Sequence, residues 1–395
     1  MSEAVILSCA RTPIGKLMGA LSPMSGPQLG AVALRAALDR ARVDAAELDE
    51  VLMGEVVSAG VGQAPARQAA VLAGVPFSVG ATTLNKVCGS GLRAVMSAAQ
   101  AIRAGDANLV LAGGMESMSN APHLVHMRAG VRFGNQSLID ANYHDGLLDP
   151  FEHWAMGHAA EYIADEYEVT REAMDRWALA SHQKAIAAID AGRFADEIVG
   201  VDIKAGKQIT QVVQDESPRR DTSFETLSKL KPAFKDDGKV TAGNAPGLND
   251  GGAAVLVASR QKAEQLGRTS LARIVGYTSA AVEPKRIFSA PAFAIPKLLK
   301  QVQWDLASVD LIELNEAFAA QVLADGYALA SVGWDWDRVN VNGGAIALGH
   351  PIGCSGARVL VTLMYALRQR GMQRGIAALC LGGGEAVAMA VELTH

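Results

Sequence analysis

Two stretches of this 395-residue chain, one in each half, share the same layout. Each runs from a cysteine through small residues, a helix-like segment, a polar turn and an apolar strand to a group of glycines. They are CGSGLRAVMSAAQAIRAGDANLVLAGGMES, beginning at Cys88, and CSGARVLVTLMYALRQRGMQRGIAALCLGGGEA, beginning at Cys354. Cys88 lies 25 residues before Gly113, and Cys354 lies 28 residues before Gly382, where Gly113 and Gly382 each begin a run of glycines. A repeated unit of this size predicts two related halves, with a site between them.

Short apolar runs alternate with helical patterns on both sides of the middle of the chain. AVILSCA and ANLVLAGGMES are typical of buried strands, and PQLGAVALRAALDRA and LRAVMSAAQAIRAG of amphipathic helices. This alternation predicts an α/β chain with largely parallel strand pairing. Residues 119–248 differ, because they hold most of the histidines, a charged helix and a long polar stretch. We therefore expect an inserted, loop-rich domain at 119–248, between a first half (1–118 and 249–268) and a second half (269–395).

Charge and apolar patterning exclude several classes of partner. The net charge is −5, no basic run is long, and no apolar segment approaches about eighteen residues. We expect neither nucleic acid nor a membrane as a partner, and the first residues do not have the pattern of a secretory signal. The four cysteines form no C-x-x-C pair, the histidines lack metal spacing, and no phosphate-binding glycine motif is present. These features predict a cytoplasmic protein with free thiols and no metal.

Cys88 is the first candidate for chemistry. It precedes an apolar helix, whose free N–H groups and partial positive charge favour a thiolate. Gly89 and Gly91 leave room for a carbonyl group near the backbone, where the Cys88 N–H can bind an oxyanion. An equally good interpretation of this stretch alone is a strand-to-helix turn with a buried thiol.

Three further positions can serve such a thiol. His350, held between a glycine and a proline in NGGAIALGHPIGCSG, is a candidate base for Cys88, or a core histidine bound to a carbonyl. Cys380 begins CLGGG, where it can be a second acid or base and the Gly382 N–H an oxyanion donor, or simply a buried strand end. Asn315 in NEAFAAQ can orient a water molecule or cap a helix.

Seven motifs, in order along essentially the whole chain, resemble the thiolase family. They are NKVCGSG, GGMESMS, LKPAF, TAGNAPGLNDG, NEAFA, GGAIALGHPIGCSGAR and CLGGG. The resemblance implies the thiolase fold: two duplicated βαβαβαββ halves in a five-layer αβαβα core, with an inserted loop domain. It also implies Claisen condensation of two acyl-CoA molecules, or the reverse thiolysis, with coenzyme A thioesters as substrates and no separate cofactor.

The resemblance also implies a role for each catalytic residue. Cys88 resembles the nucleophile that carries the acyl group as a thioester, and His350 the residue that takes its proton. Cys380 resembles the acid/base that exchanges the α-proton of the second substrate. Asn315 would hold a water that forms one oxyanion hole with His350, and the N–H groups of Cys88 and Gly382 would form the other.

Within the family, GGMESMSNAPH resembles the short-chain, acetyl-CoA acetyltransferase branch of fatty acid metabolism. The substrate-binding residues implied by the resemblance are Met156, Arg220, Thr226, Ala245, Pro246, Gly247 and Phe318. The sequence departs from the branch at three places. Ala155 stands where short-chain members usually have histidine, Pro246 replaces a serine, and a G-x-G-P motif is missing near Ile287 and Phe288.

The expected partners are acetyl-CoA, CoA and 3-oxoacyl-CoA, within a homotetramer built as a dimer of dimers. Three alternatives stay open. A thiolase of β-oxidation would prefer longer 3-oxoacyl-CoA chains, a decarboxylating ketosynthase would share the fold, and a non-catalytic lipid carrier would lack turnover. The second cysteine, Cys380, argues against a ketosynthase, and the presence of Cys88, Asn315, His350 and Cys380 together argues against a non-catalytic protein.

Overall fold

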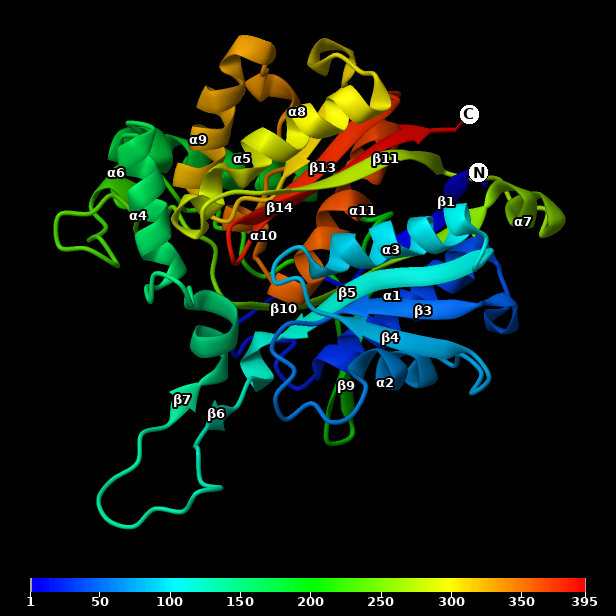
Figure 1. The fold of residues 1–395 in the computed structure, drawn as a ribbon, viewed down its shortest axis with the longest axis horizontal. Coiled ribbons are helices and arrows are strands. Elements are labelled where there is room, and N and C mark those ends of the chain that lie inside the picture. The colour runs from blue at the N-terminus through cyan, green and yellow to red at the C-terminus, as the bar shows by residue number, and fades with distance from the viewer. Residues whose placement is uncertain (1, 395) are drawn as a thin grey trace.

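The computed structural model describes residues 2–394, which form five layers of alternating helices and sheets (Figure 1). Two helices cover the outer face of the first-half sheet, two more lie between the sheets, and another pair covers the second-half sheet. The largest core cluster surrounds the two central helices, whose side chains pack against both sheets. The predicted five-layer α/β architecture is therefore confirmed.

The first half has the order βαβαβαββ. Its strands are β1 (Ala4–Arg11), β3 (Glu50–Gly54), β4 (Gly80–Leu84), β5 (Leu109–Ser117) and β10 (Asn249–Ser259), and its helices are α1 (Gly26–Ala41), α2 (Pro65–Leu72) and α3 (Ser90–Ala104). In the sheet these strands lie in the order β4-β3-β5-β10-β1. β3 is parallel to β4 and β5, whereas β10 is antiparallel to β5 and β1. Two short elements flank this half, β2 (Gly15–Lys16) and α7 (Arg260–Gln265).

The second half repeats this order, except that one strand is reduced to a single β-bridge. Its elements are β11 (Ala272–Ala281), α8 (Ala290–Val302), β12 (Leu311–Leu314), α9 (Ala319–Leu329), α10 (Ala345–Leu348), α11 (Ile352–Arg370), β13 (Arg374–Leu381) and β14 (Glu385–Leu393). The third strand of the expected βαβαβαββ unit is represented by a single bridge between Ile312 and Val339. The chain between α9 and α11 instead forms short 3-10 turns and α10. The two half-sheets meet where Val5 and Ile6 of β1 pair antiparallel with β11. The expectation of largely parallel pairing is wrong, because β10, β11 and β14 each pair antiparallel with their neighbours.

The two central helices, α3 and α11, cross at a pair of glycines. A methyl carbon on Gly91 would lie 2.6 Å from the backbone nitrogen of Ala357, and one on Gly356 would lie 2.3 Å from that of Leu92. The contact is therefore reciprocal, with the backbone of each helix against a glycine of the other. It corresponds to GSGLR and CSGAR in the sequence, so Ser90 and Ser355, rather than the two cysteines, occupy equivalent positions in the repeat.

Between β5 and β10 the chain leaves the first sheet. It forms α4 (Met156–Glu166), α5 (Arg171–Asp190), the hairpin of β8 (Val201–Ala205) and β9 (Gln208–Val212), and α6 (Phe224–Ser228). Side chains of α4 and α5 share a core cluster with α9 and with Cys380. Buried Arg11 of β1 pairs with Glu197 at 2.6 Å and with Asp215 at 2.7 Å, which ties this segment to the first sheet.

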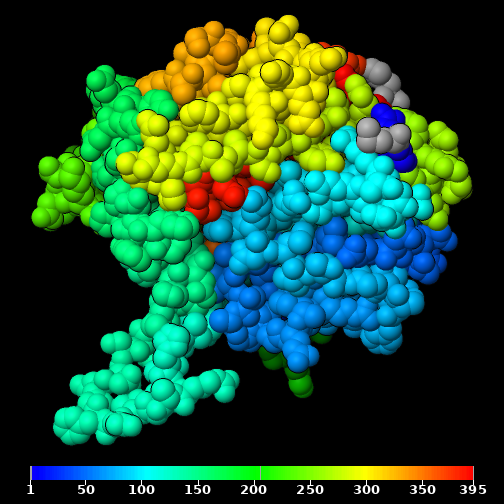
Figure 2. Space-filling view, viewed as in Figure 1, coloured from blue at the N-terminus to red at the C-terminus, as the bar shows by residue number. Residues whose placement is uncertain are grey.

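A narrow arm extends from this segment away from the body of the molecule (Figures 1 and 2). It contains the short pair β6 (His123–Leu124) and β7 (Ile139–Asp140), joined by the residues between them. Phe133 is 98% exposed and Leu138 66% exposed on this arm. In the part of the chain that the structure describes, no helix combines the length and apolar character needed to cross a membrane.

Candidate active site

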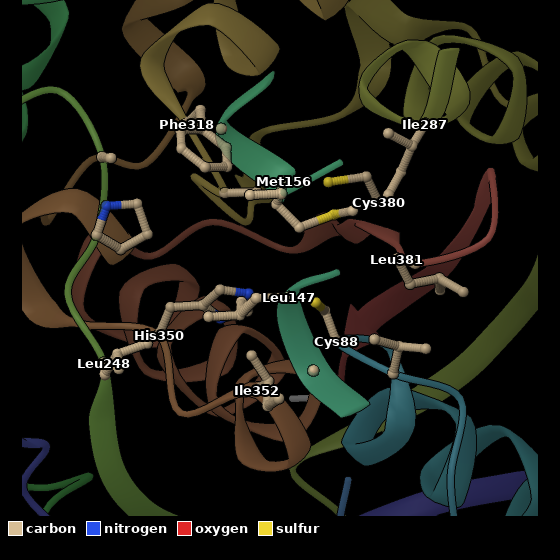
Figure 3. A pocket seen from close by; sticks show the side chains of 18 of the residues that line it. Cys88, Leu147, Met156, Leu248, Ile287, Phe318, His350, Ile352, Cys380 and Leu381 are labelled. Carbon is tan, nitrogen blue, oxygen red and sulfur yellow. The ribbon is translucent and has the colours of Figure 1, made fainter. Parts of the chain in front are cut away.

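The N-termini of the two central helices converge on one cavity of about 280 Å³. Cys88 lies two residues before α3, and His350 lies two residues before α11. Val87, next to Cys88, has a φ of 46°, which is unusual for a β-branched residue. A strained backbone conformation persists only where the surrounding structure imposes it, and such residues cluster at functional sites. Figure 3 shows Cys88, His350 and Cys380 directed toward the same space.

The Cys88 thiol lies beside two backbone donors. Burial raises its pKa to about 12, while the N–H groups of Cys88 itself and of Gly382 oppose this rise. Both amides therefore favour negative charge at this position. Donors arranged this way can stabilise an oxyanion that forms next to the sulfur.

His350 is fixed by three polar neighbours. Its backbone N–H donates to Asn249 Oδ1 at 2.8 Å, and its Nδ1 lies 2.6 Å from Ser355 Oγ. Its Nε2 lies 3.5 Å from the side-chain nitrogen of Asn315, which is completely buried. Burial, together with the positive charge of Arg358, lowers the pKa of His350 to about 3, so the imidazole is neutral. A neutral imidazole can accept a proton.

Cys380 lies near the end of β13, on the other side of the cavity from Cys88. Burial holds the pKa of its thiol well above the usual range, and the neighbouring Cys88 and Asp325 act in the same direction. Figure 3 shows the two sulfurs facing the same cavity, with Met156 beside them. Two thiols, one histidine and two backbone donors thus surround a single space.

The rest of the cavity wall is largely apolar. Phe318 stacks edge-on against Phe288, with ring centroids 5.2 Å apart, and against Phe234 at 6.5 Å. Residues from the π-helical turn Asn142–Leu147 and from α4 close the opposite side. An apolar chamber excludes water and so strengthens the electrostatic interactions inside it.

A second, more polar cavity of about 320 Å³ adjoins the first. Residues 245–248 line both, so the two cavities share one wall. Lys16, His182 and Arg219 also line the second cavity. Together the two cavities have the form expected for a ligand with an apolar reactive end and a polar, anionic body.

The structure separates the expected substrate-binding residues into two groups. Those that line the catalytic cavity are Met156, Ala245, Pro246, Gly247 and Phe318. Arg220 and Thr226 do not line either cavity. Arg220 forms an exposed ion pair with Asp190, and Thr226 lies in the first turn of α6, where its N–H donates to Oγ of the N-cap residue Ser223. The neighbouring residues Arg219 and Leu227 line the polar cavity instead.

Two family models together match almost the whole chain. The thiolase N-terminal domain matches residues 4–261, and the thiolase C-terminal domain matches residues 268–393. The chain belongs to the thiolase family.

Two relatives and one solved structure that are similar to this thiolase all bear the name acetyl-CoA acetyltransferase. It is 51% identical to the acetyl-CoA acetyltransferase of Pseudomonas aeruginosa over 98% of this chain and 99% of the relative. It is also 51% identical to the acetyl-CoA acetyltransferase of Cupriavidus necator, over 99% of this chain and 100% of that protein. The crystal structure of the Bacillus anthracis acetyl-CoA acetyltransferase superposes with a TM-score of 0.97 at 44% identity, over 100% of this chain and 99% of that one.

The departures from the short-chain thiolase pattern lie on the cavity wall. Ala155, Pro246, Ile287 and Phe288 all line it. Sequence reasoning missed other residues, among them Tyr143, Phe234 and Asn249, because their motifs carry no reactive group. Ser355 was also missed, although its position five residues after His350 was a usable signal.

Buried Glu116 supports the helix that follows His350, and a second buried carboxyl group, Glu55, lies near it. Glu116 accepts backbone N–H groups from Val56, Val57 and Gly353, the last in the first turn of α11. Burial raises its pKa to about 7. Burial and the adjacent Glu116 raise the pKa of Glu55 to about 8, and one Glu55 oxygen has no hydrogen-bond partner among the described residues.

Stability of this thiolase is expected to fall as pH rises from about 5 to about 8. In this range unfolded Glu55 has lost its proton while folded Glu55 retains it, so folding becomes less favourable by about 1.4 kcal/mol per pH unit for one such group. Glu55→Gln should flatten this decline. Urea unfolding at a series of pH values tests it, with the exposed Glu168→Gln as the control. Identical pH profiles for Glu55→Gln and the wild type would refute the assignment.

Proposed function

We propose that this thiolase is an acetyl-CoA C-acetyltransferase, which condenses two acetyl-CoA molecules reversibly to acetoacetyl-CoA and CoA. The observation that carries the proposal is the pair of thiols, Cys88 and Cys380, facing one apolar chamber beside backbone oxyanion donors. The names of the relatives at about half identity support the same activity. The reaction needs no cofactor beyond its coenzyme A substrates.

In the first half-reaction, Nε2 of His350 takes the proton of Cys88, and the thiolate attacks the carbonyl carbon of acetyl-CoA. The oxyanion of the tetrahedral intermediate accepts the N–H groups of Cys88 and Gly382. The carbon–sulfur bond to coenzyme A then breaks, and the departing thiolate takes a proton from Cys380. The product is acetyl-Cys88 and free CoA. A cysteine thioester and a coenzyme A thioester are similar in energy, so this step is reversible.

In the second half-reaction, the Cys380 thiolate removes an α-proton from a second acetyl-CoA. The enolate oxygen is stabilised by Nε2–H of His350 and by a water held by Asn315. The enolate carbon attacks the acetyl-Cys88 carbonyl, again beside the N–H groups of Cys88 and Gly382. Collapse of this intermediate releases acetoacetyl-CoA and expels the Cys88 thiolate, which takes its proton back from Nε2 of His350. Cys88 thus carries the acyl group, and Cys380 exchanges the proton on the α-carbon.

The polar second cavity is the proposed path of the coenzyme A body. Lys16 and Arg219 supply positive charge there, and residues 245–248 guide the pantetheine arm into the chamber. Met156, Ile287 and Phe318 bound the acyl end of the cavity. Pro246 has no N–H, so contacts with the arm at that position are apolar or through its carbonyl. Free thiols at the site suit a reducing compartment, which supports a cytoplasmic location.

Thiolysis of a series of 3-oxoacyl-CoA esters tests the substrate. With CoA as the second substrate, kcat/KM should be highest for the four-carbon ester. A maximum at longer chains would transfer the proposal to a β-oxidation thiolase. Absence of thiolysis across the series, in protein that is shown to be folded, would overturn both.

We further propose a homotetramer held together through the arm between β6 and β7. Val125, Met127, Phe133 and Leu138 expose apolar surface there that a second copy would bury. Replacing residues 127–137 by a short glycine–serine linker should halve the particle mass in light scattering, while thiolysis by the remaining dimer persists. A tetramer that survives this replacement would contradict the arm's role.

A further inference from the structure

Which nitrogen of His350 carries the proton decides whether the ring can act as a base toward Cys88. Ser355 lies in the first turn of α11, is fully buried, and places its Oγ 2.6 Å from Nδ1 of His350. The same hydroxyl lies 2.9 Å from the carbonyl oxygen of Pro351, four residues earlier. A helical serine commonly donates to the carbonyl at that distance in sequence.

A hydroxyl has one proton to donate. When Ser355 donates it to Pro351, only an oxygen lone pair is left to face Nδ1, and that nitrogen must then carry the ring proton. The other side of the ring agrees with this assignment. Nε2 faces the side-chain nitrogen of Asn315, a donor whose partner has to be a lone pair. Two neighbours, one in α11 and one directly after β12, therefore favour the same tautomer, with Nδ1 protonated and Nε2 free.

We propose that Ser355 is the positioning residue that holds His350 in the Nδ1–H tautomer and so makes Nε2 the proton acceptor for Cys88. The proposal rests on the function proposed for His350. Ser355 accepts the Nδ1–H both before and after proton transfer, so the ring does not have to reorient. Nε2 alone changes state: it is a base during acylation and a donor to the enolate oxygen afterwards.

Ser355→Ala should lower the rate of Cys88 acetylation and kcat by about tenfold to a hundredfold, with little change in KM, because a general base loses its orientation. Ser355→Thr keeps the hydroxyl and should recover most of this loss. The matched control is Ser8→Ala, which also removes a buried serine bonded to a backbone carbonyl but in β1, away from the cavity. It should reduce stability without slowing acetylation.

Neutron diffraction from deuterated wild-type crystals provides a readout that does not depend on a variant folding. Deuterium on Nδ1 of His350 is expected, with Nε2 bare. Deuterium on Nε2 alone, or acetylation of Ser355→Ala at the wild-type rate, would overturn the inference while leaving the proposed activity intact. A wild-type protein that neither acetylates nor thiolyses would instead refute the proposed function.

Discussion

Cys88→Ala is expected to abolish labelling of the protein by radioactive acetyl-CoA and to lower kcat for thiolysis by at least about a thousandfold. Without the thiol there is no acceptor for the acyl group. The loss should not come from misfolding, because alanine fits the space of a partly buried cysteine beside the cavity. Acid-quenched labelling followed by peptide mapping measures the effect.

Cys380→Ala should give a contrasting result. The variant still has Cys88, His350 and both backbone donors, so it should still take up one acetyl group per chain, but more slowly because Cys380 no longer protonates the departing CoA thiolate. It has no base for the second substrate, so condensation should fall by a similar factor. Cys9→Ala, at a buried thiol in β1 outside the catalytic cavity, is the matched control and should retain both activities. Labelling of Cys88→Ala, or condensation by Cys380→Ala at the wild-type rate, would overturn the division of roles.

Gly91→Ala is expected to destabilise the fold more than an ordinary core substitution does. Overpacking a core typically costs about 1–3 kcal/mol, because side chains can shift to make room. Here the added methyl meets the backbone of α11 at 2.6 Å, so a whole helix must move. We expect the free energy of unfolding to fall by more than about 3 kcal/mol, and Gly356→Ala to behave in the same way.

Thermal and urea unfolding measure this loss. Gly80→Ala is the control, because a methyl on Gly80 meets nothing within 4 Å and the residue has no positive φ. Additivity supplies a second check. The two substitutions act on one crossing, so the double variant should lose less than the sum of the single losses. A Gly91→Ala variant as stable as Gly80→Ala would show that the helices can separate without cost.

Local sequence patterns predicted most of the layered core, because strands and amphipathic helices are marked by their own periodicity. AVILSCA became part of β1, and the helix expected to end near Gly105 does so, with Gly105 in the left-handed conformation. The third strand of the second half was predicted only by analogy with the first. There the chain forms turns, and a single bridge at Val339 remains.

The residues of the candidate site also fall into two groups, those predicted from local sequence and those whose placement depended on the three-dimensional structure. Cys88, His350 and Gly382 each lie beside a glycine or proline, and Cys380 lies two residues before Gly382; the structure brings all four to one cavity. The placement of Arg220 depended on the direction of a loop, and that of Thr226 on the orientation of the short helix α6, and no periodicity encodes either. Ser355 depended on a contact across one helical turn, which becomes visible only when the ring of His350 has been placed.

The crossing of α3 and α11 at Gly91 and Gly356 also means that the reaction geometry and the acyl wall depend on different residues. It sets the spacing of the helices that carry Cys88 and His350, whereas much of the acyl wall comes from residues 142–157 and 284–288. The two sets of residues can therefore change independently. An engineer who exchanges the wall segments for those of a relative should alter the acyl chain that is accepted without disturbing the reacting sulfurs. Duplication thus supplied a fixed reaction frame, and segments outside the helix crossing supplied an acyl wall that can be exchanged.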